Sequence, residues 1–138
     1  MQKEVDSLKG SNTWTLVKLP KGKKAIKGRW VYKTKLKPNA IINKRKAWWV
    51  AKGFLQKYGI DYTKTFANTV KPIVYRLLFV LAAYYDLEIE QWDIKSAFTN
   101  SPINEEIYII QPISFKEGGD DLVCLLNKAL YRLKQSAR

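Results

Sequence analysis

Apolar and polar residues alternate most regularly between residues 29 and 54. The segment RWVYKTKL (29–36) has one face of aromatic and apolar side chains and another face that carries Lys33 and Lys35. KPNA then forms a turn, and IINKRKAWWVAKGF (41–54) follows as a partner strand. We therefore predict a β-hairpin with lysines on one side and aromatic residues interleaved. Such a surface suits a phosphate backbone with stacked bases, although two adjacent tryptophans are as common in a packed core.

In two other segments, apolar residues recur at intervals of three and four residues, which is typical of helices. Val5 and Leu8 predict a short helix that ends at Gly10. A longer apolar series predicts a helix over residues 72–86, with Pro72 in its first turn and Asp86 at its end. Residues 56–71, between the hairpin and this helix, have little periodicity and are expected to form a loop.

Shorter apolar runs predict the remaining strands. WTLVK (14–18) indicates a short strand, and LEIEQWDI (87–94) indicates another, with KSAFTN turning away from it toward a helix. EEIYIIQP (105–112) predicts a further strand, FKEGGDD (115–121) a loop, and LVCLL (122–126) the start of a last strand. The chain has no internal repeat, low-complexity segment or linker, so we expect one domain over residues 1–138.

Charge is divided unevenly between the two halves of the chain. Residues 1–71 hold 18 basic and 3 acidic residues, whereas residues 72–138 hold 7 basic and 9 acidic ones. A solvated surface is the ordinary account of one lysine cluster, but this imbalance favours a nucleic acid or another phosphate-rich partner. A membrane surface fits less well, because the basic stretch is predicted to form strands rather than an amphipathic helix.

Composition excludes several kinds of chemistry. Cys124 is the only cysteine, so it has no disulfide partner within the chain, and histidine is absent. Zinc sites of the Cys/His kind and acid–base schemes that use histidine are therefore excluded, and any metal must be a hard ion on carboxylates. No apolar run is long enough for a bilayer and the N-terminus is not a signal peptide, so we expect a soluble intracellular protein. The sequence does not distinguish a cytoplasmic from a nuclear location.

Two groups of carboxylates are candidates for a metal site. Asp93 ends the predicted strand 87–94, where spacing alone allows either a cap on the following turn or a divalent-metal ligand. Polymerases hold two metal ions between carboxylates, so a catalytic Asp93 would need an acidic neighbour. Asp120 and Asp121 are the obvious pair, but their glycine-rich surroundings favour a solvated loop tip.

The order of these segments resembles the reverse transcriptase of copia-type retrotransposons. WTLVKLPKGKKAIKGRWVYKTKLKPNA, KAWWVAKGFLQKYGIDYTKTFANTVKP, YRLLFVLAAYYDLEIEQWDIKSAFTN, EEIYIIQP and CLLNKALYRLKQS follow one another as in that family. The resemblance implies an α+β fold: the fingers and partial palm of a right-hand polymerase, an antiparallel sheet with packed helices, truncated. Residues 14–71 would be the basic fingers region and residues 72–138 the partial palm. It also implies Mg²⁺, deoxynucleotides and an RNA or DNA template-primer.

The resemblance also implies roles for particular residues. Asp93 would be the first catalytic metal-binding aspartate, and Ile94 would offer its backbone carbonyl to the same metal. Ala97 and Phe98 would lie under the incoming nucleotide, with Phe98 as the gate against a ribose 2′-hydroxyl. Four further residues would contact the nucleotide or lie near the template: Lys46, Lys52, Lys134 and Gln135.

The sequence departs from the family pattern at two positions. Members typically read YKAR on the fingers strand, and here Trp48 replaces the arginine that would clamp a triphosphate. They read LYGLKQ near the end of this segment, and here Arg132 replaces the glycine. The Y-x-D-D hairpin with the other catalytic aspartates lies downstream in the family and is absent before Arg138.

These departures lead to three hypotheses. We expect an N-terminal fragment of a copia-type reverse transcriptase, a decayed remnant of an element that does not polymerise alone. The alternative is a non-catalytic nucleic-acid-binding module that uses the basic fingers region. A third hypothesis is a chain without function that folds poorly, because half a palm leaves sheet edges and apolar helix faces uncovered.

Overall fold

The computed structural model describes residues 1–67, 69–94 and 97–136. It is a mixed α and β structure in which every pair of named strands is antiparallel. Its elements, in chain order, are α1 (Gln2–Gly10), β1 (Trp14–Lys18), β2 (Gly28–Leu36), β3 (Ile42–Ala51), the 3₁₀ turn η1 (Gly53–Leu55), α2 (Pro72–Tyr84), α3 (Ala97–Asn100), β4 (Tyr108–Ile109) and β5 (Leu122–Leu126).

A three-stranded sheet in the order β1-β5-β4 joins the two ends of the chain. Trp14 pairs with Leu126 at one end of β1 and Lys18 pairs with Leu122 at the other. β4 is shorter than the strand predicted over 105–112. Before it, Ile107 still bonds to β5, whereas after it Ile110 bonds to a different segment, which ends the pairing. The N–H of Leu126 donates to the carbonyl of Ile107 at 2.9 Å, and the N–H of Ile110 donates to the carbonyl of Ile26 at 2.9 Å.

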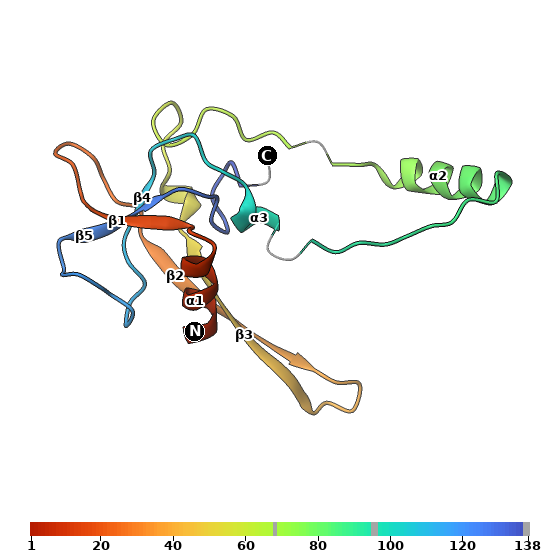
Figure 1. Ribbon diagram of the computed structural model, residues 1–138, viewed down its shortest axis with the longest axis horizontal. Coiled ribbons are helices and arrows are strands. Elements are labelled where there is room, and N and C mark those ends of the chain that lie inside the picture. Colours follow the sequence, from red (N-terminus) through yellow and green to blue (C-terminus); the bar gives the residue numbers. More distant parts are fainter. Residues whose placement is uncertain (68, 95–96, 137–138) are drawn as a thin grey trace.

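The strands β2 and β3 form the predicted hairpin, which projects from the body of the molecule (Figure 1). Its base enters the core, where the ring of Trp49 packs against that of Trp30 with 5.3 Å between centroids. α1 covers the same core through Val5 and Leu8, as their spacing predicts. The core cluster contains Leu8, Ile26, Trp49, Ala51, Ile107, Ile109, Cys124, Leu126, Leu130 and Leu133.

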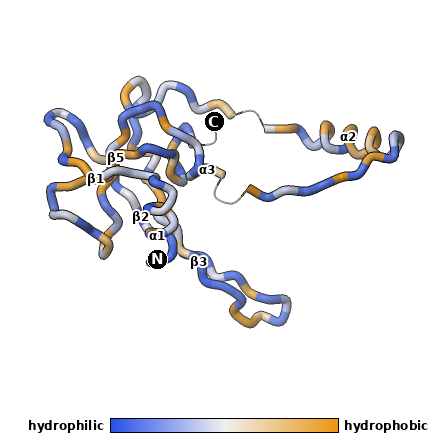
Figure 2. Tube along the Cα trace, in the orientation of Figure 1, coloured by the Kyte–Doolittle hydropathy of each residue, from blue (hydrophilic) through white to orange (hydrophobic). Residues whose placement is uncertain are grey.

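The predicted helix over 72–86 is present as α2, with Pro72 in its first turn. It ends at Tyr84. Asp86 adopts a φ of +51°, which is incompatible with a continuing α-helix. α2 has no buried residue, although it is strongly apolar, as its orange colour in Figure 2 shows. The expectation of packed helices therefore holds for α1 and is wrong for α2.

α2 lies on a long excursion of the chain, residues 69–94, which we call the α2 arm. Two extended stretches hold the helix away from the rest of the molecule (Figure 1). Every residue of the arm is exposed except the partly buried Ala82. Among the residues that the structure describes, no helix has the length and apolar character needed to cross a membrane.

The predicted strand over 87–94 is wrong. Residues 87–94 have no regular secondary structure, and Leu87, Ile89 and Trp92 are exposed. A segment with alternating residues forms a strand only where a second strand pairs with its backbone and a core covers one of its faces. The structure pairs no other described strand with this stretch, so the alternation has no sheet to join. The helix expected after it is present as the single turn α3.

Candidate nucleic-acid interface

The hairpin gathers four lysines on one face, which we call the lysine face. Lys33 lies directly opposite Lys46 across the two strands, and Lys35 lies directly opposite Lys44. Residues directly opposite each other on antiparallel strands share a face, and like charges in that position repel. The ion pairs found among the described residues involve none of these four lysines. The predicted hairpin with lysines on one side is confirmed, and its charge is available to an anionic partner.

An apolar hollow of about 560 Å³ adjoins the base of the lysine face. We call it the tryptophan groove, because the half-buried ring of Trp48 lines it, and the ammonium of Lys46 lies 5.8 Å from the centre of that ring. The neighbouring Trp49 faces the other way and is buried in the core. Trp49 therefore packs in the core, whereas the ring of Trp48 stays partly open in the groove. The groove is lined by Val31, Trp48, Val50, Tyr131, Arg132, Leu133 and Ser136.

An amide network, buried at its centre, holds Lys134 and Gln135 against residues 56–61. Gln56 donates from Nε2 to Oε1 of Gln135 at 2.9 Å, and its own Oε1 accepts the backbone N–H of Lys134 at 2.8 Å. Gln135 donates from Nε2 to the carbonyl oxygen of Asp61 at 2.9 Å. Gln135 thus makes intramolecular contacts, whereas the Lys134 ammonium is exposed and lies 5.5 Å from the ring centre of Tyr62. Gln56 was missed by sequence reasoning, because a glutamine in an aperiodic loop carries no signal.

Arg132 occupies a backbone conformation that suits glycine. Its φ is +67°, in the left-handed region that disfavours any residue with a Cβ. The residue is held there by its surroundings: the N–H of Ala51 donates to the carbonyl of Tyr131 at 3.0 Å. A Cβ added to Gly53 would lie 2.0 Å from the carbonyl oxygen of Arg132, so only glycine fits at residue 53. The glycine expected by the family resemblance at residue 132 thus has a conformational reason.

Asp93 lies on the α2 arm, exposed and outside any regular element. The structure reveals no group of three or more carboxylate or cysteine side chains near enough to hold a metal, within its described residues. The described residues therefore do not fit a two-metal centre. Ile94 is exposed beside Asp93, and Ala97 begins α3. The predicted role of Phe98 concerns a side chain that lies outside the described part of the structure.

Asp120 and Asp121 lie on an exposed loop, as their glycine-rich surroundings predict. A carboxylate oxygen of Asp120 accepts from Lys116 at 2.6 Å, and this bond lowers the pKa of Asp120 below its usual value. Asp121 lies 3.6 Å from Lys18. Both carboxylates are engaged by surface lysines.

A family model for reverse transcriptase (RNA-dependent DNA polymerase) matches residues 11–138. The chain therefore belongs to the reverse transcriptase family, and the resemblance to the copia-type enzymes is confirmed. No solved structure shows a significant match to this chain.

The relatives similar to this chain include transposon polyproteins and a mitochondrial protein. The chain is 46% identical over its whole length to the retrovirus-related Pol polyprotein from transposon TNT 1-94 of Nicotiana tabacum, and it covers 10% of that polyprotein. It is 36% identical over its whole length to the Pol polyprotein from transposon RE2 of Arabidopsis thaliana, again covering 10%. An uncharacterized mitochondrial protein of Arabidopsis thaliana, AtMg00820, is 35% identical over 72% of this chain and 59% of its own length. The chain thus corresponds to a small segment of Pol.

Proposed function

We propose that this chain is the nucleic-acid-holding part of a copia-type reverse transcriptase and that it does not polymerise by itself. Residues 14–71 serve as the fingers and residues 72–138 as a partial palm of a right-hand polymerase, joined through the pairing of β1 with β5. The observation that carries the proposal is the lysine face: two directly opposed lysine pairs, next to a groove lined by an aromatic ring. Opposed lysines cost stability in the free chain, and a phosphate backbone relieves that repulsion.

The tryptophan groove gives the same surface a place for a base. Trp48 replaces the phosphate-clamping arginine of the family pattern, so this position offers an aromatic ring rather than a guanidinium. Stacking on an aromatic side chain stabilises a bound base by about 1–3 kcal/mol and tolerates any sequence. The combination favours single-stranded template held without sequence preference, with Lys46 over the same ring.

Within a complete palm, Asp93 and the backbone carbonyl of Ile94 would hold Mg²⁺. There, two ions held between carboxylates would neutralise charge and activate a hydroxyl. In a complete palm, the nucleotide would also contact Ala97, Phe98, Lys52 and Lys134. Because one exposed aspartate cannot organise two ions, the 138-residue chain is expected to bind template-primer and leave it unextended.

Salt-dependent binding tests the proposal. A fluorescein-labelled single strand should bind with an affinity that falls steeply with salt, by fluorescence anisotropy. Changing the four lysines of the lysine face to glutamine should flatten the log–log slope by up to about 3, at about 0.7 per phosphate contact on a single strand. A control with Lys3, Lys18, Lys64 and Lys116 changed to glutamine has the same net charge and should keep most of the slope. Equal losses in the two variants would refute the lysine face as the site.

Primer extension tests the second half of the proposal. The chain is incubated with a primed template, Mg²⁺ and deoxynucleotides, with an Asp93→Ala variant alongside. We expect no extension from either. Extension by the parent chain that the Asp93→Ala variant lacks would show that this chain polymerises alone.

A further inference from the structure

The strand β2 has a backbone edge, facing away from β3, that no other strand covers. We call it the β2 edge. No third strand joins this sheet among the described residues. Apart from the pairing with β3, no backbone hydrogen bond found in the described part of the chain involves residues 28–36, whereas the end of β3 bonds to Tyr131 through Ala51. An uncovered edge of this kind is a template for a further strand.

The charge beside the β2 edge decides which strand it can accept. Lys33 and Lys35 are exposed on β2 and belong to the lysine face. A second β2 strand would bring lysines against lysines, and like charges in directly opposite positions are destabilising. An acidic strand would instead place a carboxylate beside each ammonium. The β2 edge therefore disfavours pairing with itself and favours an acidic strand.

The α2 arm contains a segment of this kind, residues 86–93, which we call the acidic segment. It holds four acidic and no basic residues, and none of them takes part in the ion pairs found among the described residues. Its residues alternate like those of a strand but have no sheet to join in a single copy of the chain. Trp92 donates from Nε1 to Oε2 of Glu90 at 2.9 Å, so these two side chains lie on one side of the segment.

The acidic segment and the β2 edge match in spacing. Glu88 and Glu90 are two residues apart, as are Lys33 and Lys35, and two residues of an extended strand span about 6.8 Å. An antiparallel strand can therefore place Glu88 opposite Lys35 and Glu90 opposite Lys33 at the same time. Residues directly opposite each other share a face, so both carboxylates would lie over the lysine face.

The same register gives Trp92 an apolar contact. It places Trp92 opposite Val31, which lines the tryptophan groove together with Trp48. The ring of Trp92 is 85% exposed in a single copy, so covering it against this groove removes apolar surface from water. Charge and apolar burial thus select one register of the added strand.

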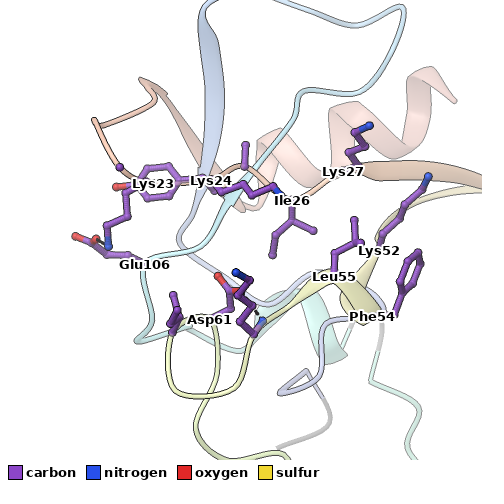
Figure 3. Close-up of a pocket in the computed structure, with 14 residues that line it drawn as sticks. Lys23, Lys24, Ile26, Lys27, Lys52, Phe54, Leu55, Asp61 and Glu106 are labelled. Atoms are coloured by element: carbon purple, nitrogen blue, oxygen red, sulfur yellow. Dashed lines mark hydrogen bonds and ion pairs between the residues drawn. The ribbon is translucent and has the colours of Figure 1, made fainter.

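A second group of lysines fits the acidic segment less well. They surround a hollow of about 530 Å³ (Figure 3). We call it the lysine-rimmed pocket, and its lining comes from residues 22–27, 52–61 and 106–108. Lys23 is paired there with Glu106 at 2.8 Å, and Asp61 belongs to the same lining. This pocket carries its own carboxylates, whereas residues 28–51 of the hairpin contain no acid.

The partner that supplies the acidic segment is a second copy of the chain. The hairpin and the α2 arm leave the body of the molecule in different directions, so the β2 edge and the acidic segment of one copy lie apart (Figure 1). Each copy carries one of each, and docking in both directions closes a dimer with two equal contacts. At physiological ionic strength the screening length is about 8 Å, which weakens the repulsion between two chains of charge +13 more than it weakens contacting pairs.

We infer that the acidic segment of one copy adds to the β2 edge of a second copy as an antiparallel strand, with Glu88 opposite Lys35 and Glu90 opposite Lys33. The segment that alternates like a strand thereby obtains the backbone partner that a single copy lacks. This inference goes beyond the proposed function, because the association needs no nucleic acid.

Exchanging the charges of the two surfaces tests the pairing. The edge variant is Lys33→Glu/Lys35→Glu, and the arm variant is Glu88→Lys/Glu90→Lys. Sedimentation equilibrium of the parent chain, without nucleic acid, should show a monomer–dimer equilibrium over about a hundredfold range of concentration. Each variant alone should self-associate at least about tenfold more weakly, because docking now opposes like charges. An equimolar mixture should dimerise within about threefold of the parent chain, since each surface then meets the opposite charge.

Two controls carry the same changes of net charge on exposed residues outside both segments. Lys3→Glu/Lys64→Glu matches the edge variant, and Asp120→Lys/Asp121→Lys matches the arm variant. Each control alone should dimerise within about threefold of the parent chain, because surface charges away from the contact have small effects. Mixing the two controls should add nothing.

Amide hydrogen exchange locates the contact. Residues 87–94 have no regular secondary structure in a single copy, so their amides should exchange rapidly at low concentration. They should become protected at concentrations where the parent chain or the mixture of variants dimerises, and they should stay unprotected in either variant alone.

Four results would overturn the inference. The first is a parent chain that stays monomeric over the whole range. The second is association that both charge exchanges leave unchanged, which would place the contact elsewhere, for example on the apolar surface of α2. The third is a mixture of variants that does not recover dimerisation. The fourth is protection of residues 87–94 that is independent of concentration, which would mean that the arm folds onto its own hairpin. Failure of the proposed function looks different, since a labelled single strand would then ignore the lysine face while the dimer persists.

Discussion

Replacing Arg132 with glycine should stabilise the chain. Arg132 is exposed and has a φ of +67°, where a Cβ meets the neighbouring backbone. Holding an L-residue in the left-handed region costs roughly 1–2 kcal/mol. Glycine removes that cost but adds about 0.4–1 kcal/mol of chain entropy to the unfolded state. The difference favours Arg132→Gly by about 0.5–1 kcal/mol, or a rise in Tm of about 2–4 °C for a chain of this size.

Urea unfolding followed by tryptophan fluorescence measures this difference, since Trp49 is buried in the core and reports its exposure. Arg132→Ala is the matched control, because it removes the same guanidinium but keeps the Cβ. Its free energy of unfolding should stay within about 0.5 kcal/mol of the parent chain. A second control, Arg45→Gly, places glycine in the strand β3 and should destabilise by about 0.5–1 kcal/mol.

Two outcomes would contradict a strained backbone at residue 132. If Arg132→Gly were no more stable than Arg132→Ala, backbone strain at residue 132 would not be the cause. If Arg132→Gly were less stable than the parent chain, the side chain of Arg132 would contribute more than its conformation costs.

Three further predictions concern buried and exposed groups. Gln56→Leu should destabilise by about 1–3 kcal/mol, seen in urea unfolding, because it leaves Gln135 and the Lys134 N–H without their buried partner; an unchanged midpoint would contradict the network. Burial raises the pKa of Cys124 from 9.0 to about 12, so the folded chain disfavours the thiolate. Its contribution to stability is complete below pH 9 and is lost as the pH rises toward 12, and a thiol reagent at pH 8 should label Cys124 only in urea; rapid labelling without urea would contradict this. Leu77→Lys in α2 should change stability by less than about 0.5 kcal/mol, whereas Leu130→Ala in the core should cost about 2–5 kcal/mol; a large loss from Leu77→Lys would mean that α2 is packed.

Local patterns were enough to predict the elements whose backbone hydrogen bonds are made within the element or with the neighbouring strand. The hairpin was predictable because each of its strands supplies the partner of the other, and α1 because Val5 and Leu8 reach a core beside them. The helix over 72–84 followed from propensity and from Pro72, although nothing in its sequence reveals that it lies uncovered. A helix needs no partner for its backbone, whereas a strand does.

Features that depend on distant segments were not predictable. The stretch 87–94 alternates like a strand, but a strand exists only where another backbone pairs with it. The lysine-rimmed pocket is assembled from three separate segments, and the contact of Gln56 with Gln135 spans 79 residues. The lysine face was predictable, since alternation alone places Lys33 and Lys35 together. The family resemblance identified Asp93 as a candidate metal ligand, but no local pattern could indicate which acidic residues lie near it in space.

The pairing of β1 with β5 has a consequence for the integrity of the chain. Because these strands come from opposite ends of the sequence, the body of the molecule does not depend on an unbroken connection between them. A protease that cuts the exposed α2 arm would leave two pieces still bound to each other through the sheet and the shared core. We therefore expect residues 1–67 and 97–136 to stay associated after such a cut, and we expect the arm between them to tolerate an inserted sequence.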